Sequence, residues 1–389
     1  MIVSFLLYNL ALGYYKAKYT ESAHGNNPSG AGVNRSATSI ETGFGYSKGN
    51  CTHCHEQHAS IGGGEPSPTG GPDQFSLFAP MNATSQTTNF CFQCHKGIGS
   101  VQYGILTNHT YSKNFGGGTA TFDNIYDAFN TATGSSHNLA DVLTRATQAW
   151  TTTFTSTTNA CIVCHNPHTA QKNHPVTVNA LNGVNTAVRM PGDYKANDYN
   201  LWGDETGSGE MMSEWWTLYQ APYCKGKTTY EPACNSTFNG SNLPGIIGGC
   251  RSGCHRGTAA YSTERSRNLR PVNWTNDSTE PGNRSVHGKF PSSPSGDDGF
   301  PIAPYTDGTK NYVLSCTDCH EPHGSPNEWL LRTTVNGKDN ISITSSGWWW
   351  AFCTACHDLV TGMPDGWHKS GMQKCSNCHY HDYTLEGWF

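Results

Sequence analysis

The stretch "CTDCHEPHGSPNEWLLR", residues 316–332, places two cysteines and two histidines within its first eight positions. Thiolates and imidazoles are ligands for zinc. The same spacing, C-x-x-C followed at once by histidine, is also the attachment signature of c-type haem. The number of times this pattern recurs along the chain decides between the two chemistries.

C-x-x-C-H occurs six times in the 389 residues, and a seventh copy, "CRSGCH", has one extra residue between its thiols. Two thiols at this spacing can reach the vinyl groups on one porphyrin edge, and the adjacent histidine then falls under the iron. Zinc sites do not require a histidine after every second cysteine, so the pattern favours seven c-type haems. The predicted thioether cysteines are Cys51, Cys54, Cys91, Cys94, Cys161, Cys164, Cys250, Cys254, Cys316, Cys319, Cys353, Cys356, Cys375 and Cys378. The predicted proximal ligands are His55, His95, His165, His255, His320, His357 and His379.

The composition is that of a chain with little hydrophobic core of its own. Only 35% of residues are hydrophobic, the mean hydropathy is −0.56, and there are 43 glycines and 20 prolines. Seven buried macrocycles would supply the missing apolar surface. The formal net charge is −5, and haem propionates would make it more negative, which argues against nucleic acid as a partner.

The motifs also indicate a compartment, because haem is attached to C-x-x-C-H outside the cytoplasm, where disulfides persist. The two remaining cysteines, Cys224 and Cys234, are therefore predicted to form one local disulfide, with two free thiols as the alternative. We expect an exported protein, extracellular or at the cell surface, and periplasmic if it is monomeric.

An internal repeat supplies the distal ligands. Three motifs continue to a further histidine, as in "CIVCHNPH", each has an isolated histidine 24 to 29 residues upstream, and each is followed by a plainer motif. The predicted boundaries are an N-terminal arm at 1–23, two-haem units at 24–115, 116–265 and 266–360, and a one-haem piece at 361–389. The predicted distal ligands are His24, His58, His137, His168, His287, His323 and His368, with His109, His174 and His381 in reserve.

The position of each repeated histidine limits what it can bind. A histidine three residues beyond a proximal ligand is too close to reach over its own haem, so we expect it to bind the other haem of its unit. His53 lies between the two thiols of its motif and is expected to be exposed.

The fold class expected from this pattern is mostly irregular chain with a few short helices and little sheet, wrapped around closely packed haems. Gly, Pro, Asn and Ser interrupt any longer periodicity. Short helices are predicted at 139–150 and 208–220. The three tryptophans at 348–350, just before Cys353, are expected to cover a haem face or an interface.

The stretches "CTDCHEPHGSPNEWLLR" and "CIVCHNPH" resemble the doubled C-x-x-C-H modules of multihaem c-type cytochromes. The haem density and acidic balance resemble the extracellular cytochromes that polymerise into conductive filaments. The resemblance implies that a histidine of one subunit completes a haem in its neighbour, and it makes His24 the candidate. Seven haems and the stretched motif depart from the four, six or eight haems that are typical of that family.

The N-terminal stretch "IVSFLLYNLALG", residues 2–13, is too short for a membrane-spanning helix of about 20 residues. It resembles a signal sequence, but no Lys or Arg precedes Lys16. We therefore interpret 1–23 as a retained arm that packs against a neighbouring copy, and we expect no transmembrane span.

Bis-histidine ligation fills both axial positions, so such haems pass electrons and leave no place for substrate. The predicted function is therefore a non-enzymatic electron conduit, polymerised outside the cell, that carries respiratory electrons from redox donors to external acceptors. A soluble periplasmic carrier is one alternative. A multihaem reductase of nitrite or hydroxylamine is another, but it needs one haem with an open site.

Overall fold

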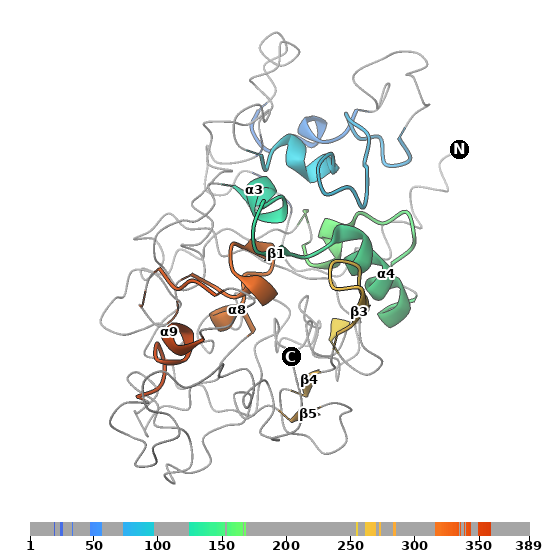
Figure 1. The fold of residues 1–389 in the computed structure, drawn as a ribbon. Helices are drawn as coiled ribbons and strands as arrows, with labels where there is room; N and C mark the ends of the chain where they lie inside the picture. The colour runs from blue at the N-terminus through green and yellow to red at the C-terminus, as the bar shows by residue number, and fades with distance from the viewer. Residues whose placement is uncertain are drawn as a thin grey trace, which may run out of the picture.

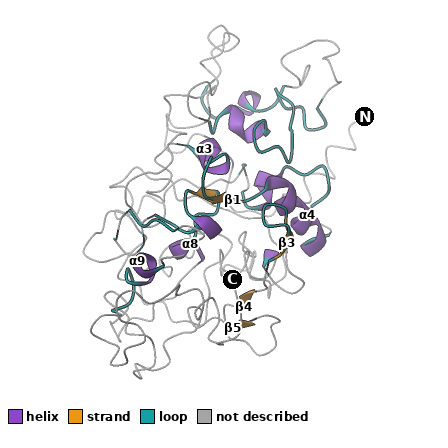
Figure 2. Ribbon diagram, in the orientation of Figure 1, coloured by secondary structure: helices purple, strands orange, loops and turns teal. Residues whose placement is uncertain are grey.

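The computed structural model describes residues 19, 24–25, 33, 47–56, 73–96, 124–151, 154–165, 167–168, 254–255, 261–269, 272–273, 283–284, 316–333, 335, 338, 340–343 and 349–358. Over these residues the chain is mostly loop, with a few short helices and two-residue strands (Figures 1 and 2). This confirms the expected fold class in its coarse form. The predicted boundaries of the repeat units stay a prediction.

The helices are short α-helices and 3₁₀ turns, and most of the 3₁₀ turns, together with α8 and α9, contain a cysteine of a motif. The α-helices are α3 (Ile125–Phe129), α4 (Leu139–Ala149), α8 (Cys316–Cys319) and α9 (Trp350–Cys353). The 3₁₀ turns are η2 (Cys51–His53), η3 (Phe90–Gln93), η5 (Ala160–Val163) and η8 (Glu328–Leu330). The strands are β1 (Ser135–Ser136), β2 (Tyr261–Ser262), β3 (Arg267–Asn268), β4 (Val272–Asn273), β5 (Asn283–Arg284) and β6 (Gly324–Ser325).

Helix α4 confirms the helix predicted at 139–150. Asn138 caps its N-terminus, and its side-chain oxygen accepts hydrogen bonds from the backbone N–H groups of Ala140 and Asp141. Leu139, Leu143 and Ala146 are buried at helical spacing. They form one core with hydrophobic side chains of α3, η3 and η5, so α4 supports two of the cysteine motifs.

A two-stranded antiparallel ladder joins distant parts of the chain, because β1 pairs with β6. Ser136 lies opposite Gly324 in the register. A Cβ on Gly324 would lie 1.8 Å from the carbonyl oxygen of Ala128. Glycine has no side chain and therefore permits this close approach of the two backbones. The ladder also places His137, which follows β1, beside His323, which precedes β6, and the His137 N–H donates to the His323 carbonyl at 3.3 Å.

A second hydrophobic core lies at the C-terminal end of the described chain. Leu331, Val335, Ile341, Ile343, Trp349 and Ala355 are buried in it. The Asn327 side chain joins the loop segments of this core. Its amide donates to the carbonyls of Arg332 and Ile341, and its oxygen accepts from the N–H of Ile343 at 2.7 Å. This core supports the motifs at Cys316 and Cys353.

Two smaller sheets complete the described structure. The hairpin of β2 and β3 packs beside α4, where the backbone N–H and hydroxyl of Thr263 both donate to the Asp141 carboxylate at 2.7 Å. Strands β4 and β5 pair in parallel. Within the described ranges, no helix is both long and apolar enough to span a bilayer.

Candidate functional site

The cysteine motifs share one local geometry. In each of the five motifs that are described in full, the histidine N–H donates to the carbonyl of the first cysteine at 2.9 Å. This one turn brings residues at i, i+3 and i+4 to the same side of the helix. Both thiols and the imidazole therefore converge, as covalent attachment of a haem beside its iron ligand requires. The motifs are those beginning at Cys51, Cys91, Cys161, Cys316 and Cys353.

The cysteines of the described motifs are all thiols, and none of the eleven in the described part of the chain forms a disulfide. The predicted pair Cys224 and Cys234 lies outside the described residues. So do Cys250, Cys375, Cys378 and His379.

Four pairs of imidazole rings face each other, and the two rings of each pair come from distant parts of the sequence. Their ring centres are 6.2 Å apart for His55 and His168, and 6.1 Å for His24 and His95. The corresponding separations are 5.7 Å for His165 and His323, and 6.5 Å for His137 and His255. Each pair joins one predicted proximal ligand to one predicted distal ligand.

These separations fit an iron atom between the rings. Metal–imidazole bonds are about 2 Å long, and a ring centre lies about 1 Å beyond its nitrogen, so two imidazoles on one iron have centres about 6 Å apart. In the closest pair the Nε2 atoms of His165 and His323 are 3.5 Å apart. Because this is shorter than the 5.7 Å between ring centres, these rings point nitrogen to nitrogen. An iron would need about 4 Å between those nitrogens, so this pair would have to open slightly.

The pairs are of two types that alternate along the chain. His168 and His323, which end a C-H-x-P-H motif, face rings that are nearly parallel to theirs, at 10° and 12°. His24 and His137, the upstream histidines, face rings tilted by 46° and 47°. The tilted pairs thus recur within the first and second units, and the parallel pairs recur at the junctions between the first and second units and between the second and third.

This arrangement differs from the expectation that each repeated histidine binds within its own unit. His168 faces His55 of the preceding unit, and His323 likewise faces His165 of the preceding unit. The sequence makes His24 the candidate for reaching a haem in a neighbouring copy, but in this structure its ring faces His95 of its own chain. Local spacing along the sequence does not reveal this offset.

Backbone carbonyls fix the orientation of several rings. The Nδ1–H of His24 donates to the carbonyl of Pro167 at 2.8 Å, and that of His137 donates to the carbonyl of Pro322. His55 donates in the same way to Phe75 at 2.8 Å, and His320 to Trp329 at 2.7 Å. Such a bond fixes the tautomer and leaves Nε2 available to a metal. Both proline carbonyls belong to C-H-x-P-H motifs, which explains how each upstream histidine is tied to the next unit.

Burial favours the neutral form of seven of the predicted ligand rings by lowering their pKa values, and the neutral form is the one that binds iron. Desolvation lowers the pKa of His165 to about 4, helped by the nearby His24. Desolvation likewise lowers the pKa of His255 to about 4, helped by His137. The pKa values of His24, His137, His168, His320 and His323 are lowered by burial as well.

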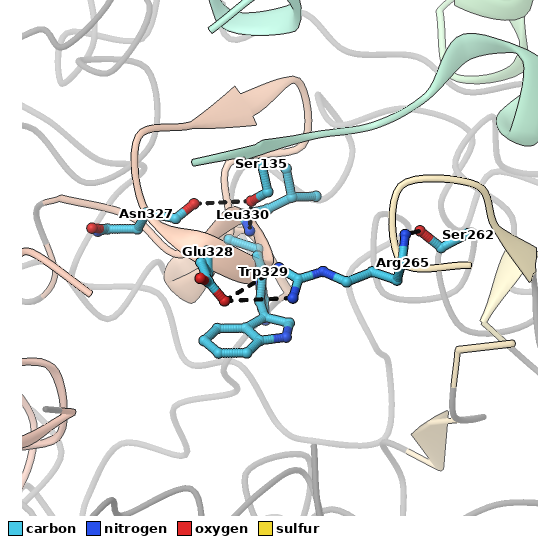
Figure 3. A network of polar contacts seen from close by, with 8 residues as sticks. Ser135, Ser262, Arg265, Asn327, Glu328, Trp329 and Leu330 are labelled. Atoms are coloured by element: carbon cyan, nitrogen blue, oxygen red, sulfur yellow. Dashed lines mark hydrogen bonds and ion pairs between the residues drawn. The ribbon is translucent and has the colours of Figure 1, made fainter. Parts of the chain in front are cut away.

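The turn beside the fifth motif is held by a polar network (Figure 3). Trp329 and Leu330 both have positive φ angles, 56° and 59°, an uncommon conformation for side chains of this size. It directs the Trp329 carbonyl to His320 and the Leu330 N–H to the Ser135 hydroxyl at 2.6 Å. The Ser135 hydroxyl in turn donates to the carbonyl of Asn327 at 2.9 Å.

Two ion pairs flank this turn, one almost fully buried and the other partly exposed. Arg332 and Glu321 are 3.0 Å apart, with side chains only 2% and 7% exposed. Arg265 and Glu328 are 3.4 Å apart and 28% and 20% exposed, and the Arg265 guanidinium also lies over the Trp329 ring. Trp349 packs against Trp329 with ring centres 5.3 Å apart, so this tryptophan of the 348–350 run is a core residue.

One sequence expectation is wrong: His53 is not exposed. Its side chain is 1% exposed, and its Nε2–H donates to the carbonyl of Ser47 at 3.0 Å. This bond closes the loop that leads into η2.

The remaining candidate ligands lie outside the described residues. These are His58, His287 and His368, together with the reserve histidines His109, His174 and His381. The helix predicted at 208–220 also lies outside them. Sequence reasoning missed the asparagines that precede the motifs, although "TTNFC" and "TTNAC" recur before Cys91 and Cys161.

Residues 304–338 match the family model described as the doubled CXXCH motif. The match contains the motif from Cys316 to His320 and the second histidine, His323. It supports a multihaem c-type cytochrome with covalently bound haem that carries electrons. No curated protein and no solved structure gives a significant match to the chain.

Proposed function

We propose that this chain is a seven-haem cytochrome in which bis-histidine haems form a continuous electron conduit, and that copies of it polymerise outside the cell. The observation that carries the proposal is the set of four facing imidazole pairs. Bound haem supplies one-electron oxidation and reduction. The protein's own residues anchor it, fill both axial positions and exclude water.

The proposed axial pairs follow the ring geometry. His55 is paired with His168, His95 with His24, His165 with His323, and His255 with His137. Both sides of these four irons are then occupied, which leaves no open position for a substrate such as nitrite. This favours electron transfer over the reductase alternative at these four centres.

The offset between units also suggests how copies join. By the same rule, His357 would take His287, and His320 would take a histidine that follows the third unit, where His381 stands two residues after His379. By the same rule, His58 would bind a haem of a unit other than its own. We propose that this haem belongs to a second copy, so that His58, rather than His24, makes the contact, and that the seventh haem, held by His379, is the one it completes, in place of His368.

Electron microscopy of the native protein tests the polymer directly. Filaments with a regular subunit repeat support the conduit, whereas dispersed particles of one chain's mass would leave a soluble carrier. The variant His58→Ala is expected to give monomers that keep their haems, while His24→Ala is expected to polymerise with one haem lacking its distal ligand. Filaments from His58→Ala with unchanged haem spectra would contradict the assigned contact.

A further inference from the structure

A buried pair of asparagines lies between two cysteine motifs that are 70 residues apart. The Asn89 side-chain amide donates to the Asn159 oxygen at 3.1 Å, and the Asn159 amide donates back to the Asn89 oxygen at 3.0 Å. Asn89 is 0% exposed and Asn159 is 5% exposed. The pair thus forms a closed, two-way bond away from water.

Each asparagine also begins a cysteine turn. The Asn89 oxygen accepts from the N–H of Cys91 at 3.0 Å, and the Asn159 oxygen accepts from the N–H of Cys161 at 2.9 Å. For a helix cap alone, serine, threonine or aspartate would serve equally well. Only asparagine supplies in addition the N–H donor that the reciprocal bond uses.

The amide pair brings the first thiols of the two motifs together. The Cys161 thiol lies 3.6 Å from the Asn89 oxygen, which also caps the turn that begins at Cys91. The two thiols are close enough for each to shift the pKa of the other, lowering that of Cys91 and raising that of Cys161. A backbone bond strengthens the contact, because the Ala160 N–H donates to the Ala83 carbonyl at 2.9 Å, and the Asn89 amide donates to that same carbonyl.

We infer that Asn89 and Asn159 are positioning residues that set the electronic contact between the second and third haems. The inference rests on the proposed function. A haem is joined to its cysteines by short covalent bonds, so haem edges attached to Cys91 and Cys161 would lie close together on either side of the Asn89 oxygen. The amide pair therefore joins the first two-haem unit to the second.

Serine variants separate this role from capping. Asn89→Ser and Asn159→Ser keep an oxygen that can cap the turn but lose the amide donor. Asn50→Ser is the matched control, because the Asn50 oxygen caps η2 by accepting from the Thr52 N–H at 3.0 Å. Soret circular dichroism of the full-length oxidised protein measures the coupling between haems in contact, which a role in capping alone would leave unchanged.

We expect each serine variant to lose part of the Soret couplet while keeping the wild-type number of haems and a low-spin spectrum. The double variant is expected to lose no more than Asn89→Ser alone, because that change already removes both the reciprocal bond and the bond to the Ala83 carbonyl. Asn50→Ser is expected to keep the full couplet.

An unchanged couplet in Asn89→Ser and Asn159→Ser, additive losses in the double variant, or an equal loss in Asn50→Ser would each overturn the inference. If one variant fails to accumulate, the other removes the same bond from the opposite side. A wild-type protein without low-spin haems would instead reject the proposed function, so the two failures are distinguishable.

Discussion

At the residue scale, the decisive feature is that single histidines lie against a cysteine turn far away in the sequence. His323 faces His165 across 158 residues, nitrogen to nitrogen. Replacing His323 by alanine should therefore leave the third haem with one axial ligand. We expect one high-spin haem in optical and electron paramagnetic resonance spectra, and binding of cyanide by that haem alone.

His53→Ala is the control for that variant, because His53 is buried and its ring donates to the backbone carbonyl of Ser47. It should lower stability without changing the spin state. Seven low-spin haems in His323→Ala would reject the assigned axial pair.

The ion pair of Arg332 and Glu321 also acts at the residue scale. Both side chains are almost fully buried next to the fifth motif, so Arg332→Met would leave a carboxylate that has lost its charged partner. Breaking a buried pair from one side costs about 3–5 kcal/mol. Denaturant unfolding of the haem-loaded protein measures this loss.

Arg265→Met is the matched control, because its pair with Glu328 lies near the same turn but is partly exposed. An exposed pair contributes about 0–1 kcal/mol, so the control should be clearly less destabilised. Equal losses of unfolding free energy in the two variants would show that burial does not explain the contribution of Arg332 to stability.

At the scale of elements, the ladder of β1 and β6 positions two imidazoles at once. His137 and His323 lie at its end, and they face rings of two different motifs. Gly324→Ala would push a methyl group against the Ala128 carbonyl and force the strands apart. We therefore expect weakened ligation at the third and fourth haems together, measured as two high-spin centres.

Ser136→Ala tests the same ladder without added bulk, because Ser136 lies opposite Gly324 and already has a Cβ. It should leave the spectra unchanged. A Gly324→Ala protein with only one altered haem would show that the ladder does not position both rings.

The elements that could be predicted from the sequence are those formed by residues close together along the chain. Helix α4 is predictable because Leu139, Leu143 and Ala146 repeat at helical spacing after Asn138, and the cysteine turns follow from their own motif. The ladder of β1 and β6 is not, because two residues per strand are too few for an alternating pattern. The facing rings depend on it, so their pairing across units could not be predicted from spacing.

At the scale of the whole molecule, the seven motifs predict seven covalently bound haems. Mass spectrometry of the denatured protein should show a mass increase of seven haems. A variant with Cys375 and Cys378 both changed to alanine should carry six, because both thioether bonds of the seventh haem are removed. An unchanged haem count in that variant would show that the C-terminal motif carries no haem.

The offset of the facing rings has a consequence for how such a chain matures. When the chain emerges from the membrane N-terminus first, the haem at Cys51 and Cys54 cannot meet His168 until more than a hundred further residues have appeared. With the proposed axial pairs, each new unit would bring the histidine that completes an earlier haem, together with a haem that awaits the next unit.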